Sequence, residues 1–216
     1  MKSVARTAWY LELAGEMLRS ALRSPTNVKG YVHPLGFSHI VLPSPDARKF
    51  RLHVWPSVPL PEFSSPPQVH NHGFRFTSLV LRGSVQHTPF QTEPASVPSE
   101  NLWKVFRVMQ RGIDTHLNDT GEFVRIDAGQ AATYSAGSIY EFPEGAYHVS
   151  ASIGEQAAIT FVIAQKAPGI SSYVLKAHAS GLSKWRKIWL ARPLVVALVE
   201  EAHSSVGALL KRGAGE

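Results

Sequence analysis

Apolar residues recur with a helical spacing near the start of the chain. Between residues 4 and 24, apolar side chains return every three to four positions among charged ones. Ser3 is a suitable N-cap residue before this stretch, and Ser24 followed by Pro25 favours its end. The pattern predicts an amphipathic helix over residues 4–24.

From Phe37 onward the pattern changes to short runs of β-branched and aromatic residues, separated by clusters of Pro, Gly, Ser and Asp. Many short strands with no helix between them favour a jelly-roll barrel or a sandwich over a parallel α/β sheet. We therefore expect a mainly β fold, in which the Pro-rich connection over residues 56–67 is a surface loop. The predicted strands are residues 38–42, 49–55, 68–72, 75–81, 84–91, 102–109, 122–126, 130–135, 138–142, 147–152 and 157–165.

Beyond Lys176 the pattern becomes helical again. Pro193 divides this part into two predicted helices, residues 183–191 and 194–211, because proline breaks a helix interior. The most apolar stretch, residues 188–199, is shorter than the roughly 20 residues of a spanning helix and contains a charge, so we expect no membrane segment.

The length of the chain indicates one domain. A chain of 216 residues suits one β-barrel with helical additions. We expect a single domain over residues 1–216, made of a helical N-terminal segment (1–35), a barrel (36–175) and C-terminal helices (176–216).

Composition narrows the chemistry. The sequence contains no cysteine, which excludes disulfides, zinc ribbons and thiol nucleophiles, so any metal site must use His, Asp or Glu. The net charge of +6 comes partly from basic residues near the C-terminus, and these indicate a solvated helix face, so we expect no nucleic-acid partner. Acidic residues interrupt the apolar start of the chain, unlike a signal peptide, and we expect a cytoplasmic protein.

Two histidine-bearing segments carry the candidate chemistry. His70 and His72 lie in the first, VHNHGFRFTSLVLRG. A spacing of two on a strand places both side chains on one face, where two imidazoles can share an ion. The second segment is GSIYEFPEGAYHVSAS, in which Gly137 is followed by five residues, Pro-x-Gly, two residues and His148.

The second segment resembles the second conserved motif of the cupin superfamily. The first segment resembles the first cupin motif, His-x-His followed about ten residues later by a glycine, here Gly83. In cupins the two motifs form adjacent hairpins of one jelly-roll barrel, and their histidines converge inside it. The resemblance implies a cupin barrel with an N-terminal helix and a C-terminal helical extension. It also implies that His70, His72 and His148 are the ligands of one catalytic metal ion.

The sequence departs from the cupin pattern where a fourth ligand is expected. Cupins usually supply a carboxylate four or five residues after the second histidine, whereas this chain has Phe76 and Thr77 there. The resemblance then implies a three-histidine site. Three neutral imidazoles leave the +2 charge of a divalent ion uncompensated and several coordination positions open, which suits an anionic substrate and dioxygen beside it. Iron(II) is the metal we expect first, and zinc, nickel, manganese and copper also accept imidazole.

A three-histidine centre is similar to that of the thiol dioxygenases, and the run KFRLHVW and the helix before the barrel resemble theirs loosely. Those enzymes carry a Ser-x-His-x-Tyr element downstream of the last ligand. The corresponding strand here reads AAITFVIAQ, whose only hydroxyl belongs to Thr160. We therefore do not expect a thiol substrate.

Further candidate residues lie outside the two motifs. Arg51 and His53 share one face of a predicted strand, opposite Phe50, Leu52 and Val54, and either face can line the cavity. If the first face does, Arg51 can hold a substrate carboxylate through two hydrogen bonds. Tyr134 and Tyr147 are candidate hydroxyl groups near the metal. The isolated histidines His39, His53, His87 and His116 are interpreted as surface or core residues, although His87 can project toward the barrel interior.

The leading hypothesis is a cupin-type non-haem iron(II) dioxygenase or oxygenase that acts on a small polar or anionic metabolite which chelates the metal. The first alternative is a redox-neutral lyase, isomerase or hydrolase in which the metal acts as a Lewis acid. The second is a non-catalytic cupin that binds a small molecule. The expected partners are a small-molecule substrate and dioxygen, and the resemblance to cupins also implies a homodimer.

Overall fold

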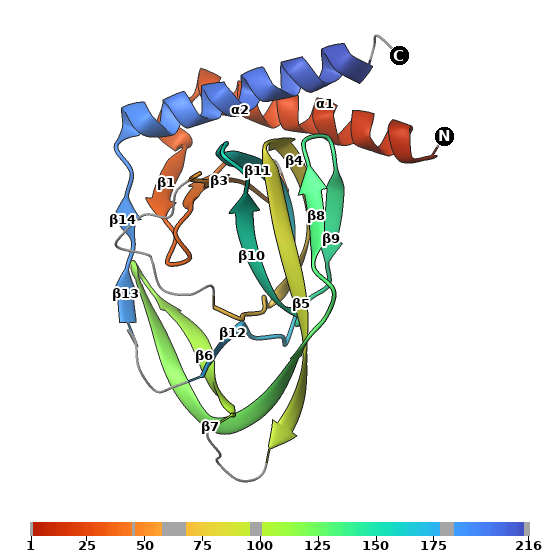
Figure 1. Ribbon diagram of the computed structural model, residues 1–216. Coiled ribbons are helices and arrows are strands. Elements are labelled where there is room, and N and C mark those ends of the chain that lie inside the picture. Colours follow the sequence, from red (N-terminus) through yellow and green to blue (C-terminus); the bar gives the residue numbers. More distant parts are fainter. Residues whose placement is uncertain (1, 45, 58–67, 96–100, 178–183, 214–216) are drawn as a thin grey trace.

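The computed structural model describes residues 2–44, 46–57, 68–95, 101–177 and 184–213, which form two antiparallel β-sheets and two long helices (Figure 1). The helices are α1 (Lys2–Arg23) and α2 (Arg192–Gly213), with a short 3-10 turn at Pro25–Asn27. The strands are β1 (Lys29–Val32), β2 (Ser38–Val41), β3 (Lys49–Trp55), β4 (Phe74–Arg82), β5 (Ser84–Ala95), β6 (Trp103–Arg111), β7 (Asp114–Ala128), β8 (Ala132–Ser135), β9 (Ile139–Phe142), β10 (Tyr147–Ile153), β11 (Ala158–Lys166), β12 (Tyr173–Lys176), β13 (Lys184–Arg186) and β14 (Ile188–Trp189).

Strands β1 to β4 belong to the first sheet and β5 to β8 to the second, and from β9 to β11 the chain alternates between the two sheets. The first sheet has the order β14-β1-β2-β3-β11-β4-β9, and the second has the order β10-β5-β7-β6-β12, with β13 paired to β7 and β8 paired to β5. Some neighbouring strands are far apart in the sequence, such as β11 between β3 and β4 and β10 beside β5, and two facing sheets joined in this way form a jelly roll. The predicted mainly β barrel with helical additions at both ends is confirmed.

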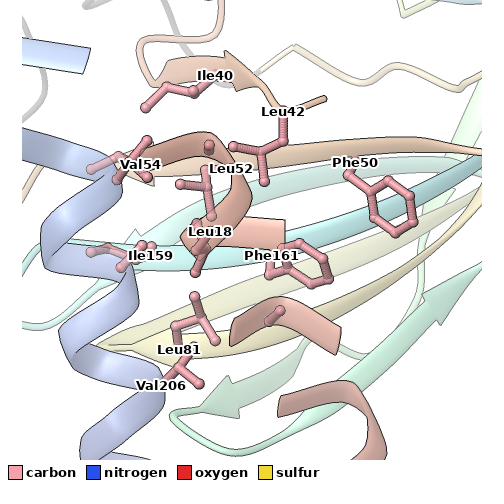
Figure 2. Packing of buried hydrophobic residues seen from close by; sticks show 14 of the residues in the cluster. Leu18, Ile40, Leu42, Phe50, Leu52, Val54, Leu81, Ile159, Phe161 and Val206 are labelled. Atoms are coloured by element: carbon pink, nitrogen blue, oxygen red, sulfur yellow. The ribbon is translucent and has the colours of Figure 1, made fainter. Parts of the chain in front are cut away.

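The main hydrophobic core lies between the first sheet and the two helices. Helices α1 and α2 pack against each other and cover the outer face of this sheet (Figure 1). Figure 2 shows Leu18 of α1 and Val206 of α2 together with apolar side chains of β2, β3, β4 and β11. Removing each large apolar side chain from water contributes about 1.5–3 kcal/mol to folding. Much of the stability of the fold therefore arises outside the barrel, on the face away from its interior.

Helix α2 buries one side against the first sheet. By length and composition alone it could cross a membrane, since its mean hydropathy reaches 1.3, and 28% of that apolar window is buried in the fold. Its buried side chains, Val195, Val199, Ala202 and Val206, belong to the core beneath the two helices. The apolar pattern of α2 is explained at least on that side by packing against the sheet.

The C-terminal part differs from the prediction. A helix was expected over residues 183–191, but residues 184–186 and 188–189 form β13 and β14, and residue 183 lies outside the described residues. This prediction is wrong because the two short strands find partners elsewhere: Trp185 pairs with Thr115 of β7, and Trp189 pairs with Tyr31 of β1. The second predicted helix, residues 194–211, lies within α2, and the helix expected over residues 4–24 is α1.

The N-terminal segment 1–35, expected to be helical, also contains strand β1. The strand expected over residues 68–72 is reduced to an extended segment in which His70 makes isolated bridges. Strand β12 was not predicted, and β7 begins eight residues before the predicted strand 122–126. The Pro-rich connection over residues 56–67 lies mostly outside the described residues.

Candidate metal centre

The backbone of the first motif is held between strands from the second sheet. His70 and His148 lie directly opposite each other and exchange both backbone hydrogen bonds, with N–O distances of 3.1 and 2.9 Å. On its other side His70 bridges to Val174 of β12. The two motifs, far apart in the sequence, are thus fixed in register by the backbone itself.

A turn in the second motif completes this junction. Gly145 has a φ of 78°, in the left-handed region that glycine adopts without strain, and its N–H donates to the carbonyl oxygen of His72 at 2.9 Å. The Asn71 side chain donates to the carbonyl of Gly145 at 3.2 Å and accepts from the N–H of Tyr173 at 2.6 Å. The Pro-x-Gly spacing therefore places the turn that orients His72.

The three motif histidines converge. The ring centroids are 4.5 Å apart for His70 and His148, 4.9 Å for His70 and His72, and 5.2 Å for His72 and His148. Each side chain offers a ring nitrogen, and these nitrogens lie within 4.8 Å of one another. Three nitrogens at this spacing can reach one ion at the usual metal–nitrogen distance of about 2.0–2.1 Å after small ring rotations.

Hydrogen bonds set the tautomers of two of these rings. Nδ1 of His70 lies 2.9 Å from the carbonyl oxygen of Gln68, and Nδ1 of His148 lies 3.1 Å from that of Ala146. A carbonyl oxygen only accepts, so each Nδ1 carries the proton and donates it. The Nε2 atoms are then unprotonated, which is the form in which an imidazole binds a metal ion.

Burial keeps the three imidazoles neutral. Desolvation lowers the pKa of His70, and it lowers the pKa of His72 and of His148 well below 6.5. Mutual repulsion between the rings lowers the last two further. Metal binding competes with protonation, so ligands that are already neutral bind without releasing protons. The donor set therefore fits a divalent ion that accepts nitrogen ligands.

An aromatic side chain occupies the place of the usual carboxylate. The Phe76 ring lies 5.6 Å from the His72 ring and 6.2 Å from the His148 ring. The hydroxyl of Thr77 points elsewhere and donates to Glu141 at 3.4 Å. Phe74 stacks on His72 at 4.7 Å. The side of the site formed by β4 is thus aromatic, and the described residues that line the cavity supply no fourth anionic ligand.

The histidines line a cavity of about 460 Å³ inside the barrel. Arg51 and His53 also line it, whereas Phe50, Leu52 and Val54 belong to the core beneath the helices. Of the two orientations left open by the sequence, the structure has the one in which Arg51 faces the cavity. A cavity of this volume is in the range of small-molecule sites.

The two tyrosine candidates do not belong to the described wall of the cavity. Tyr134 packs against Tyr140 at 4.8 Å and against His87 at 5.7 Å, one layer behind the wall. Tyr147 packs in an apolar cluster of the second sheet, and burial raises its pKa to about 12. The structure thus brings Arg51 to the candidate site and leaves both tyrosines outside its surface.

Four histidines outside the motifs also line the cavity: His33, His39, His53 and His87. Sequence reasoning treated the last three as isolated and did not single out His33. The sequence could have indicated that two of them lie together, because His39 and His53 are on strands predicted one after the other. In the structure they are direct partners in the register of β2 and β3. His87, which the sequence allowed to project toward the barrel interior, does line the cavity, and its Nδ1 lies 2.6 Å from the Ser150 hydroxyl.

Comparisons with known proteins concern the fold. No protein-family profile and no curated protein matches this sequence. Among solved structures, the Schizosaccharomyces pombe Cnp3 cupin domain matches at 7% identity over 61% of each chain, with a TM-score of 0.33. The hydroxypropylphosphonic acid epoxidase from S. wedmorenis matches at 10% identity over 64% of this chain and 56% of its own, with a TM-score of 0.37. A recombinant oxalate oxidase in complex with glycolate matches at 15% identity over 64% of this chain and 55% of its own, with a TM-score of 0.34. The matches span less than two thirds of these chains.

Proposed function

We propose that the chain is a metal-dependent enzyme of the cupin type, with His70, His72 and His148 holding one divalent ion, and that it is a non-haem iron(II) dioxygenase or oxygenase. The observation that carries the proposal is the convergence of three imidazoles, each with a lowered pKa, in the wall of one cavity. Bringing three imidazoles together away from water costs free energy, which a shared metal ion would offset.

The chain's own residues would prepare the site in three ways. The carbonyls of Gln68 and Ala146 fix the tautomers of His70 and His148. The aromatic rings of Phe74 and Phe76 lie beside His72 and would make this side of the site apolar. Because all three imidazoles are neutral, the charge of an ion held there would attract an anionic group of the substrate.

Iron(II) bound by the three histidines would supply the one-electron chemistry that reaction with dioxygen requires. The protein would contribute positioning, exclusion of water and a fixed donor geometry. The substrate of this proposal is a small polar or anionic metabolite that chelates the metal.

The proposal is tested by elemental analysis of protein purified without oxygen, compared with the His148→Ala variant. Near-stoichiometric iron that is lost in the variant supports the proposal, and it leads to an oxygen-consumption screen with chelating acids. The matched control is His203→Ala on α2, outside the cavity wall, which is expected to keep its metal.

Other outcomes redirect or end the proposal. Stoichiometric zinc or nickel, with activity that is indifferent to oxygen, favours a redox-neutral enzyme that uses the ion as a Lewis acid. No bound metal after reconstitution with iron, zinc, nickel or manganese contradicts the metal centre and leaves a binding protein built on the same barrel.

A further inference from the structure

The cavity has a second polar region, formed by strands β1, β2 and β3, the segment after β1, and the segment before β14. We define this cationic end by its residues His33, His39, Arg51, His53 and Lys187, all of which line the cavity. The metal centre proposed above uses none of them. Their arrangement is therefore an independent observation about what the cavity binds.

The charges of this region are of one sign. Arg51 and Lys187 both lie close enough to His33 and His39 to lower the pKa of each ring by repulsion, in addition to the larger effect of burial. Among the described residues that line the cavity there is no aspartate or glutamate. The cavity therefore presents a positive potential that its described walls do not compensate.

Arg51 lacks a counter-charge within the described part of the chain. Its guanidinium lies over the Phe74 ring at 4.8 Å, and no hydrogen bond or ion pair joins it to another described residue. Its side chain is partly buried in the cavity wall, and this burial lowers its pKa. The nearby Arg48, in contrast, pairs with Asp46 at 2.6 Å. A partly buried cation without a partner is costly unless an anion accompanies it.

Two unused nitrogens line the same cavity. Nε2 of His53 and Nε1 of Trp55 are buried and have no hydrogen-bond partner among the described residues. Buried donors of this kind are usually satisfied, by protein, water or ligand. His53 lies two residues after Arg51 on β3, so both side chains point to the same side of the strand.

We propose that the cationic end binds a carboxylate or phosphate group, held by Arg51 and Lys187 with a hydrogen bond from His53. This inference builds on the proposed function, because it gives the substrate two anionic ends: one that chelates the metal and one that occupies the cationic end. The two ends of the cavity are close, since His72 and Arg51 both contact the ring of Phe74. A compact substrate reaches both.

The test measures anion binding to the metal-free full-length chain, so that it does not depend on the metal. Benzoate and inorganic phosphate are titrated by calorimetry, and neutral benzamide is the control ligand. We expect benzoate or phosphate, but not benzamide, to bind the metal-free wild type. Arg51→Gln and Lys187→Gln should each weaken binding by about tenfold or more, since a hydrogen bond to a charged group is lost. Lys29→Gln, an exposed cation of β1 outside the cavity wall, should leave binding unchanged.

The preferred probe identifies the anion: tighter benzoate binding indicates a carboxylate, and tighter phosphate binding indicates a phosphoryl group. No anion binding to the metal-free wild type, equal binding of benzamide, or unchanged affinity in both Arg51→Gln and Lys187→Gln would overturn the proposal. Metal analysis of the same proteins separates it from the proposed function. If the protein binds metal but no anion, the proposed metal centre stands and the proposed anion site is wrong. If it binds anion but no metal, the anion site stands and the metal centre is wrong.

Discussion

The first sheet separates two regions with opposite character. Its outer face, under α1 and α2, carries apolar side chains such as Phe50 and Leu52, which are fully buried. Its inner face carries Arg51 and His53, which line the cavity. Both faces come from one strand, β3, in which neighbouring residues point in opposite directions. The comparison shows that in this fold the helix-covered core can supply stability while the cavity retains costly polar groups.

The largest effect is expected in the helix-covered core. Leu52→Ala should lower the free energy of unfolding by about 2–5 kcal/mol, because it leaves a cavity among fully buried side chains. The metal content of the protein that remains folded should be unchanged. Urea unfolding of the metal-free protein measures the first value, and elemental analysis measures the second. Val41→Ala, at an exposed position of β2, is the control. A large loss of metal in folded Leu52→Ala protein would show that the two regions are coupled.

The next effect is expected in the cavity and depends on pH. Burial lowers the pKa of His87 from 6.5 to about 4. The unfolded chain therefore takes up this proton at a higher pH than the folded chain does. The free energy of unfolding is therefore unaffected by this proton above pH 6.5. As the pH falls from 6.5 toward 4, it decreases by about 1.4 kcal/mol per pH unit.

The variant His87→Gln tests this sign in the metal-free protein. It should reduce the slope of unfolding free energy against pH between pH 6.5 and 4, and have little effect on the slope above that window. Chemical unfolding at half-unit pH steps measures the slope, with His203→Gln on α2 as the control. An unaltered slope in His87→Gln would contradict a neutral, desolvated imidazole at this position.

The smallest effect concerns two neighbouring residues of β4 that lie on opposite faces. Phe76 faces the three histidines, and Thr77 faces Glu141. Phe76→Glu should raise zinc affinity by about tenfold or more. A residue that only hydrogen-bonds to a metal ligand can change metal affinity by this factor, and a carboxylate that binds the ion directly should contribute at least as much. It should also destabilise the metal-free protein, because it buries a carboxylate. Thr77→Glu should leave zinc affinity unchanged. Competition with a zinc-sensitive dye measures both, and equal affinities would contradict the assigned orientations.

The sequence predicted the parts of the molecule that local pattern determines. Helix α1 and most strands followed from hydrophobic periodicity and turn residues, and the two motifs led to His70, His72 and His148, which the structure brings together. The glycine spacing was informative because the turn at Gly145 requires a positive φ. Whether these histidines bind a metal stays a prediction.

The sequence did not predict features that depend on distant partners. Strands β13 and β14 are too short to show a period, and they exist because β7 and β1 offer edges for pairing. The apolar pattern of this segment was therefore interpreted as that of a helix. His33 and Lys187 were missed for a similar reason: they reach the cavity only when β1 and β14 pair beside β2. The extent of the single domain and the homodimer stay predictions.

The bridge between His70 and His148 has a topological consequence. The chain contains no cysteine, so no disulfide ties distant segments together. An ion shared by His70, His72 and His148 would act as a reversible cross-link that closes a long loop of the polypeptide. Because the three ligands come together only in the folded chain, the free energy of binding the ion would add to the stability of the fold. The candidate catalytic centre would thus also hold distant segments of the barrel together, and removing its ion with a chelator would release this cross-link.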